Sequence, residues 1–327
     1  MGKIRKLADF LTGGFNLYGF NDNQLDEIHE ACTDILANNG IFVEHPEALE
    51  IFDGLGCEID KSTQVVKIPR DVVEKAIESA PAQFRLAGRN PENNVEMKGG
   101  GMVFASFGGG LRLNDPNTGE YRNATKRDLS AATLLQDALS EYGIVNRAVN
   151  SLDADQRFGS LHNFEAMLSH TTKPLSIGPD NGRHLEVMYE MASLVMGGKE
   201  NLQKNPMVLV AGCLVSPLRM VNHGCDIIMT AARWKMPVRW TSMVLAGASG
   251  PISLAGTFIV QNTEFLAGLV LHQGAQKGAP MVYGNASGIM EMCSGDASVG
   301  TPENGMLTAF SSIMGRRYSV PTWSAGG

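Results

Sequence analysis

The feature that most constrains the fold is a regular alternation of short apolar runs with longer amphipathic runs from about residue 100 onward. The apolar runs predict strands over 102–107, 144–150, 174–178, 207–213, 238–244, 281–285 and 320–324. The runs between them predict helices near 125–141, 158–170, 183–196, 217–234, 252–276 and 302–317. Repeated strand–helix units of this length favour parallel strands joined by right-handed crossovers.

The spacing of these units predicts an α/β fold, a TIM (β/α)8 barrel that is incomplete at its C-terminus by a helix, a strand and a further helix. A doubly wound open sheet is the alternative, and it usually carries a glycine-rich nucleotide loop after its first strand. The run Phe107–Leu113 is rich in glycine, but it lacks the G-x-G-x-x-G spacing and opens no helix. We therefore interpret this run as a turn at a strand end.

Residues 1–100 predict a separate, mainly helical extension with a hairpin, and residues 101–327 the partial barrel, which lacks its last strand and helices. Asn21 and Gln24 match the capping box that begins a helix, and Gly40 supplies its end. Residues 57–69 alternate as a hairpin does, and a further helix is expected over 70–79.

Charge and cysteine usage exclude several classes of partner. The net charge is −7 and there is no block of Lys and Arg, which argues against a nucleic-acid partner. The five cysteines are scattered, as is typical of reduced thiols in a cytoplasmic protein. Residues Met1–Phe10 contain no apolar core of signal-peptide length. The apolar run 252–272 carries amide and carboxyl groups at its middle, so it predicts a buried helix and no membrane partner.

No familiar cofactor or nucleophile motif is present. The seven histidines show no zinc-site spacing, and no metal site is predicted. There is no D-x-H-x-x-G motif, so we expect the chain to bind no corrinoid directly. A nucleophile elbow and a phosphate-binding loop are also missing from the sequence.

Five polar residues remain as candidates for substrate binding. Glu264 and Asn262 lie within a predicted apolar helix, where a carboxylate must be paired, hydrogen-bonded or protonated. Glu264 is either a substrate-facing acid with a raised pKa or part of a contact between helices or subunits. Tyr283 and Asn285 close a predicted strand, and strand ends in barrels favour function. His162 is either a general base at the barrel mouth or a histidine that caps or packs a helix.

Three junctions between predicted strands and helices share one pattern. Ser216-Pro217, Gly250-Pro251 and Thr301-Pro302 each place a capping residue before a proline. This pattern predicts that each pair begins a helix.

Several ordered segments resemble the trimethylamine methyltransferase family of corrinoid-dependent enzymes. The resemblance is carried by Ser242-Met243 through Gly247 to Pro251, Leu254-Ala255-Gly256-Thr257, Asn262 to Gly268, Asp34-Ile35-Leu36 with Gly40-Ile41, Glu58 through Val66 to Pro69, Ser216-Pro217-Leu218, Val282-Tyr283-Gly284 and Gly300 to Glu303. The set covers nearly the whole chain in order, and it implies a TIM barrel.

The resemblance implies transfer of a methyl group from trimethylamine to the Co(I) corrinoid of a separate, cognate corrinoid protein, in methylamine catabolism or methanogenesis. The cobalamin is then carried by the partner, and no cofactor is bound directly. Trimethylamine-specific members carry a pyrrolysine just after a strand that looks like 318–327, encoded by an in-frame amber codon. The catalytic residue is therefore expected immediately after Gly327, with none in the chain itself, and this fragment alone is expected to be inactive.

Two other interpretations stay open at this point. One is a methyltransferase without pyrrolysine that passes a methyl group from betaine or another quaternary amine to a corrinoid. The other is a truncated, non-catalytic remnant that only binds a partner. A homo-oligomer is also expected, because the run 252–272 is long and apolar.

Overall fold

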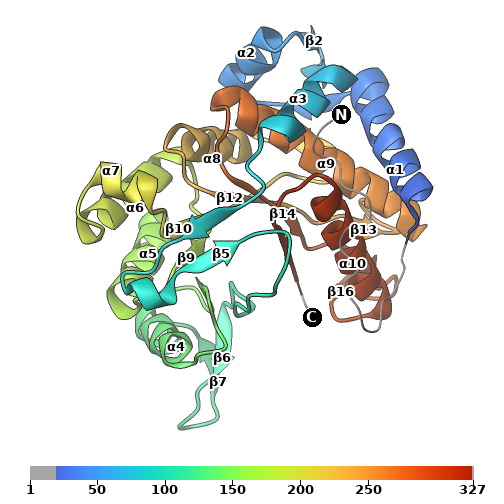
Figure 1. Cartoon of the computed structure of the whole chain (residues 1–327). Coiled ribbons are helices and arrows are strands. Elements are labelled where there is room, and N and C mark those ends of the chain that lie inside the picture. Colours follow the sequence, from blue (N-terminus) through green and yellow to red (C-terminus); the bar gives the residue numbers. More distant parts are fainter. Residues whose placement is uncertain (1–19, 326–327) are drawn as a thin grey trace. The chain divides into compact units, whose positions relative to one another are not determined.

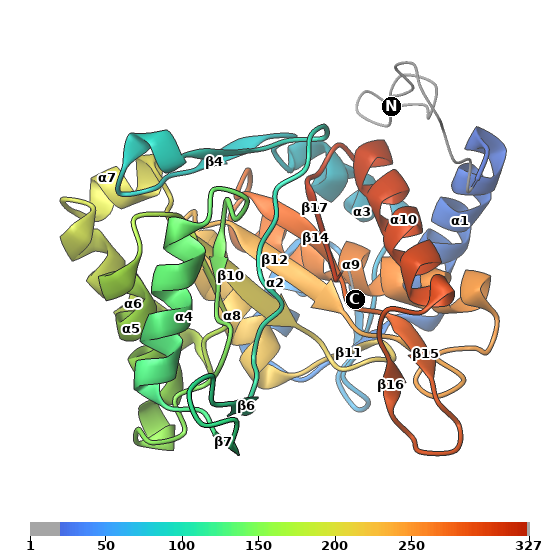
Figure 2. The same cartoon turned by 90° about the horizontal axis from the view of Figure 1, so that it is seen from below.

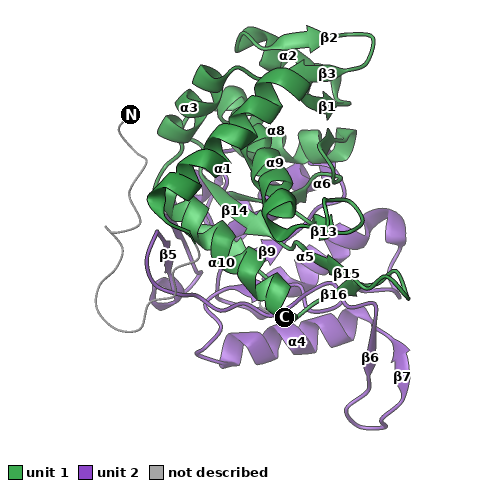
Figure 3. Ribbon diagram, turned by 90° about the vertical axis from the view of Figure 1, so that its right-hand side faces the viewer, with its two compact units in different colours: residues 1–83, 212–233, 238–327 green, residues 84–211, 234–237 purple. Residues whose placement is uncertain are grey.

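The computed structural model describes residues 20–325. The predictions about Met1–Phe10 and about the position after Gly327 therefore lie outside the described residues. Contacts divide the chain into two compact units (Figure 3). Unit 1 comprises residues 1–83, 212–233 and 238–327, and unit 2 comprises residues 84–211 and 234–237. The units are defined by contacts between residues, and each combines segments that are separate in the sequence. They therefore do not test the predicted domain boundary at residue 100, which stays a prediction.

The first helix of unit 1 begins where the sequence predicts. The Asn21 side chain accepts a hydrogen bond from the Gln24 N–H, and the Gln24 side chain accepts one from the Asn21 N–H. This capping box begins α1 (Asp22–Asp34), which continues as a π-helical turn over Ile35–Asn39. Gly40 ends it at φ 77°, and a Cβ there would lie 2.5 Å from the Val66 carbonyl oxygen. Glycine is required at this position both by backbone angle and by space.

A small sheet and two helices complete the N-terminal part of unit 1 (Figure 1). The sheet has the order β11-β1-β3-β2. The strands of this sheet are β1 (Ile41–Val43), β2 (Glu58–Asp60), β3 (Val65–Lys67) and β11 (Arg219–Met220). β2 and β3 pair antiparallel, which confirms the predicted hairpin. The helices are α2 (Pro46–Gly54) and α3 (Arg70–Ser79).

Unit 1 also contains three neighbouring parallel strands with helices packed on one face (Figure 2). Their order is β17-β14-β12, with bounds Val238–Ser242 for β12, Met281–Asn285 for β14 and Thr322–Ser324 for β17. The helices are α8 (Asn222–Arg233), α9 (Leu254–Ala275) and α10 (Pro302–Arg317). A second small sheet has the order β13-β15-β16, from Leu245–Ala246, Gly288–Met290 and Ala297–Ser298.

Unit 2 repeats the same strand–helix order. Its parallel strands β8, β9 and β10 are Val145–Asn146, Leu175–Ile177 and Val208–Cys213, and the last two residues of β10 are grouped with unit 1. Its helices are α4 (Lys126–Ala138), α5 (Gly159–His170), α6 (Gly182–Val195) and the unpredicted α7 (Lys199–Lys204). Two hairpins pair β4 with β5 and β6 with β7, from Phe84–Leu86, Val95–Met97, Arg112–Asn114 and Tyr121–Asn123.

In each unit, every strand of this parallel set pairs with the next one along the chain. This order is that of a (β/α)8 barrel, in which each strand is followed by a helix and then by its neighbour. The prediction of a partial TIM barrel preceded by a helical extension is confirmed.

The prediction of a first barrel strand over residues 102–107 is wrong. Residues 102–107 form only an isolated bridge at Phe104, and Met102 and Phe107 are 77% and 75% exposed. Glycines at 99–101 and 108–110 flank the segment on both sides. Because glycine weakens a strand and leaves no side chain to pack, the apolar side chains here do not become buried as predicted.

Two of the three proline junctions also differ from prediction. α8 begins only at Asn222, because Arg219 and Met220 pair with β1 as strand β11. α9 is capped by Ser253, whose hydroxyl accepts from the Gly256 N–H. At the third junction Thr301 does cap α10 as predicted.

The apolar run 252–272 forms α9, the central helix of unit 1. Within residues 20–325, α9 is the one helix long and apolar enough to cross a membrane, but 72% of its most apolar window is buried inside the protein. Gly268 lies against the indole of Trp240, where a Cβ would come within 2.1 Å of Nε1. The predicted buried helix is thus confirmed, and its packing is close enough to require glycine.

Candidate functional site

Glu264 lies on α9 and is completely buried. Its carboxylate accepts hydrogen bonds from the Ser216 hydroxyl and the Leu218 N–H, both at 2.9 Å. Burial raises the pKa of Glu264 to about 7, although these donors oppose the shift. The carboxyl group therefore anchors the turn between β10 and β11, and it changes its charge near neutral pH.

A buried chain of hydrogen bonds surrounds Asn262, the second candidate on α9. The Tyr283 hydroxyl donates to Asn262 Oδ1 at 3.0 Å, and Asn262 Nδ2 donates to the Tyr318 hydroxyl at 2.8 Å. Burial raises the pKa of both tyrosines well above their usual value, so both hydroxyls stay neutral. Phe265 stacks on Tyr283 with ring centroids 4.0 Å apart. The structure thus brings together Asn262 and Tyr283, two of the five predicted residues.

The same chain reaches the N-terminal helices. His29 on α1 contacts the Tyr318 hydroxyl at 3.1 Å through Nδ1 and Glu74 on α3 at 2.9 Å through Nε2. Cys32 on α1 lies 3.3 Å from Asn262 Nδ2. Buried polar groups need partners, and here those partners tie α1, α3, α9 and β14 into one assembly.

Asn285 ends β14 and is 1% exposed. Its Oδ1 accepts from the Ser287 N–H at 2.7 Å, whereas its Nδ2 has no hydrogen-bond partner among the described residues. His162 lies in unit 2, in the first turn of α5, with Nδ1 3.4 Å from the Lys126 amine. The substrate-binding role of these two residues, and of Glu264, Asn262 and Tyr283, stays a prediction.

Strand alternation shows where the four candidates of unit 1 point. Trp240 and Tyr283 are in register on β12 and β14, and the Trp240 indole N–H donates to the Glu264 carbonyl on α9. We call the sheet face formed by Trp240, Ser242, Tyr283 and Asn285 the helix face, because it packs against α9 and α10. Four of the five predicted residues thus lie on this face or on α9, which covers it.

The opposite face of these strands carries functional groups that the sequence reasoning missed. Thr241, Gly284 and Trp323 are register neighbours on β12, β14 and β17. Arg239 is on the same face, with its guanidinium carbon 4.4 Å from the centre of the Trp323 ring. The available signal was period-2 alternation in Val238–Ser242, which separates Arg239 and Thr241 from Trp240.

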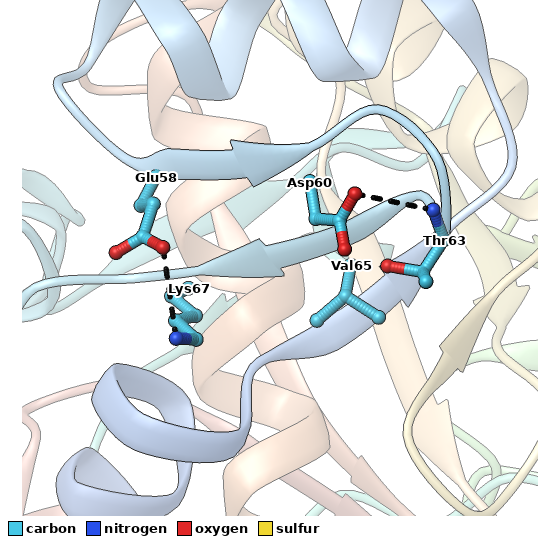
Figure 4. A pocket seen from close by; sticks show the side chains of 5 residues that line it. All are labelled: Glu58, Asp60, Thr63, Val65 and Lys67. Atoms are coloured by element: carbon cyan, nitrogen blue, oxygen red, sulfur yellow. Dashed lines mark hydrogen bonds and ion pairs between the residues drawn. The ribbon is translucent and has the colours of Figure 1, made fainter.

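Other surfaces offer less. Among residues 20–325 no group of His, Cys, Asp and Glu is arranged to hold a metal ion. A hollow of about 210 Å³ lies beside the β2–β3 hairpin, lined by Glu58, Asp60, Thr63, Val65 and Lys67 (Figure 4). Its polar groups already bond within the hairpin, since Asp60 accepts from the Thr63 N–H and Glu58 pairs with Lys67 at 3.6 Å. We do not regard this hollow as the functional site.

The fold and site define a partial TIM barrel with an N-terminal helical extension. The model of the trimethylamine methyltransferase family matches residues 6–327, and the chain belongs to this family. It is 40% identical to trimethylamine methyltransferase MttB of Desulfitobacterium hafniense (strain DSM 10664 / DCB-2), over 96% of this chain and 63% of the relative. It therefore spans a little under two thirds of that relative's length.

Two further similarities bear on substrate and fold. The glycine betaine methyltransferase of Desulfitobacterium hafniense (strain Y51) is 31% identical, over 94% of this chain and 64% of the relative. The crystal structure of the Methanosarcina barkeri monomethylamine methyltransferase MtmB matches with a TM-score of 0.60 at 10% identity, over 94% of this chain and 63% of that one. At this identity the match supports the fold alone.

Proposed function

We propose that this chain is part of an enzyme that moves a methyl group from trimethylamine to the Co(I) corrinoid of a separate corrinoid protein. The observation that carries the proposal is the family match along residues 6–327, together with the name of the 40% identical relative. In this reaction the N–CH3 bond of the protonated amine breaks and the methyl group goes to Co(I), which becomes methyl-Co(III). The nitrogen keeps the electron pair of the broken bond and its proton, so that neutral dimethylamine leaves. The cobalamin belongs to the partner protein in this proposal.

The residues of this chain would seat the amine and exclude water. The face with Arg239, Thr241 and Trp323 carries the polar and aromatic groups that small ligands require. The buried hydrogen bonds of Glu264 and Asn262 hold the opposite, helix face rigid behind it. A pyrrolysine that orients the amine, as the family resemblance implies, is part of the proposal and would lie beyond the described residues.

Location and assembly belong to the same proposal. A cytoplasmic enzyme is supported by free cysteines in the described part of the chain and by the burial of α9. A homo-oligomer stays a prediction. The helix that suggested it, α9, is buried within unit 1 and so gives it no further support. A role in methylamine catabolism or methanogenesis follows only if the methyl transfer is demonstrated.

The second candidate methyl donor is glycine betaine or another quaternary amine. In this case the enzyme would contain no pyrrolysine. The 31% identical relative named for glycine betaine supports it, as does the presence of a guanidinium group at the candidate site. The non-catalytic remnant is the third interpretation, and the same experiment tests it.

The test is a methyl-transfer assay with the full chain, including whatever sequence its gene encodes after Gly327. The protein is mixed with a reduced cognate corrinoid protein and with trimethylamine or glycine betaine, and methylation of cobalt is followed by its absorption spectrum. Methylation with either amine supports the proposed enzyme class, and the active amine identifies the donor. Binding of the corrinoid protein without methylation by either amine would overturn it and favour the remnant.

A further inference from the structure

Asn285 and Ser324 are neighbours at the carboxyl ends of two parallel strands. They are the last residues of β14 and β17, and they lie opposite one another in the register of this pair. Thr322, two residues before Ser324, points toward α10, since a Cβ on Gly315 would collide with its side chain. Side chains alternate along a strand, so Ser324 lies on the helix face, as Asn285 does. The two polar side chains are therefore adjacent, between the sheet and its helices.

Neither side chain completes its hydrogen bonds within residues 20–325. Asn285 is 1% exposed, and its Oδ1 accepts from the Ser287 N–H, so the other amide atom is the donor Nδ2. Asn285 Nδ2 and Ser324 Oγ are both buried, and both lack a partner among these residues. Native structures rarely keep such a group unless water or a ligand bonds it. Two of them in adjacent positions point to one molecule that bonds both.

The spacing of the strands limits the size of that molecule. Neighbouring strands lie about 4.8 Å apart, and two hydrogen bonds of about 2.8 Å through one oxygen span a similar distance. The adjacent positions on the same face, Ser242, Tyr283 and Thr322, are uncharged, so nothing there favours a buried ion. A single water molecule fits the pair, because it can accept from the amide and bond the hydroxyl in either direction.

Gln261 on α9 brings a further acceptor to the same face. Its Nε2 donates to the Ser311 and Tyr283 hydroxyls at 2.6 and 3.3 Å, and both hydroxyls donate to other acceptors. The amide therefore cannot be reversed, and Gln261 Oε1 stays a buried acceptor without a partner among the described residues. The Gln261 carbonyl accepts from Ser242, the register neighbour of Asn285 on β12. The helix thus adds a third polar group that water on this face can satisfy.

We infer that Asn285 and Ser324 bind one buried water molecule, and that this water fixes the carboxyl end of β17. The backbone supports the same role, since the Asn285 carbonyl accepts from the Ala325 N–H at 3.1 Å and the Ala325 carbonyl accepts from the Thr308 hydroxyl at 3.3 Å. The carboxyl ends of barrel strands carry functional groups. Asn285 is therefore a positioning residue that acts from the helix face, and its effect on methyl transfer rests on the proposed function.

The test uses the full chain with its encoded continuation and has a structural and a kinetic part. A high-resolution crystal structure should show one water oxygen within about 3.2 Å of both Asn285 Nδ2 and Ser324 Oγ. Ser324→Ala should lose this water, and amide hydrogen exchange over residues 322–325 should become about tenfold faster. In the methyl-transfer assay, Ser324→Ala should lower kcat about tenfold and leave KM within about twofold, because orientation and not affinity is lost.

Ser176→Ala is the matched control. Ser176 on β9 also has a buried hydroxyl without a partner among the described residues. Its register neighbours are the apolar Leu209 and Asn146, whose amide nitrogen is already hydrogen-bonded, and neither offers a buried polar atom that lacks a partner within residues 20–325. Replacing Ser176 should therefore change neither hydrogen exchange over residues 322–325 nor kcat.

Ser324→Thr and Ser324→Val form a second pair of nearly equal shape, which tests the hydroxyl alone if alanine unfolds the protein. Only Ser324→Thr should keep the water and the activity. Four results would overturn the inference: no water between the two atoms, unchanged hydrogen exchange in Ser324→Ala, unchanged kcat in Ser324→Ala, or equal losses in Ser324→Thr and Ser324→Val. Absence of methyl transfer with either amine, together with the water and the faster exchange, would refute the enzyme class and leave the water site standing.

Discussion

The two faces of the unit 1 strands use polar residues in opposite ways. On the helix face, Asn262, Tyr283 and Glu264 are fully buried and bond to groups of the protein. On the opposite face, the buried Thr241 hydroxyl has no hydrogen-bond partner among the described residues. Polar groups that satisfy one another hold a fold together, whereas polar groups left unsatisfied are what a binding site offers to a ligand.

This contrast shows how a polar residue in an apolar run should be interpreted. Glu264 stands out in the sequence because its neighbours are apolar, and that same environment makes it depend on protein partners. Arg239 and Thr241 stand out less, because a strand alternates between its two faces. Each of the following predictions tests whether stability belongs to the helix face and ligand binding to the opposite face.

The largest effect is expected from Glu264→Leu. The change leaves the Ser216 hydroxyl and the Leu218 N–H without their acceptor in a buried site, and each loss costs about 1–3 kcal/mol. We expect the free energy of unfolding to fall by about 2–5 kcal/mol in urea titrations. Glu303→Leu, on the first turn of α10, is the control, since Glu303 is partly exposed. Equal losses in both variants would contradict a special role for the buried carboxyl.

The pH dependence of stability should also depend on Glu264. Its pKa is raised from 4.5 to about 7 in the folded protein, so the folded state holds a proton that the unfolded state has released between these values. Its contribution is complete below pH 4.5 and is lost as the pH rises to 7, by up to about 3 kcal/mol. The difference in unfolding free energy between the unsubstituted protein and Glu264→Gln should therefore fall over this range and then level off. A difference that stays constant with pH would show that the carboxyl does not titrate there.

Close packing on the helix face gives the next effect. Gly268→Ala places a Cβ 2.1 Å from the Trp240 ring nitrogen, and the core must shift to admit it. We expect a loss of about 1–3 kcal/mol in unfolding free energy. Gly54→Ala on α2 is the matched control, because a Cβ there meets no atom within 4 Å and alanine favours helix. A cost at Gly54 as large as that at Gly268 would remove the argument from packing.

Much of the fold follows from local sequence rules. The capping box at Asn21, the hairpin of β2 and β3, and the order of the parallel strands depend on residues close together in the chain. For residues 102–107 the local rules predict a buried strand that the structure does not form. Apolar composition predicts burial only where the backbone also pairs with a neighbouring strand. The late start of α8 depends on the pairing of β11 with β1, about 180 residues earlier, which no local pattern reveals.

The candidate site was harder to predict than the fold. Asn262 and Tyr283 are predicted to bind substrate. The structure does bring them together, but with Tyr318 and His29 and within a buried network. The row of Thr241, Gly284 and Trp323 comes from three strands far apart in sequence. It becomes visible only when the register between strands is known, since a shift by one residue turns each side chain to the other face.

The smallest change in stability is expected at Thr241, and it distinguishes the two faces most sharply. Thr241→Val keeps the shape of the side chain and removes a buried hydroxyl that has no hydrogen-bond partner within residues 20–325, so stability should change by less than about 1 kcal/mol or rise. If the opposite face binds the substrate, the same change should weaken binding of the methylated amine several-fold in calorimetry. A clear loss of stability would mean that the hydroxyl is bonded within the protein, and the row would then belong to the scaffold like the helix face.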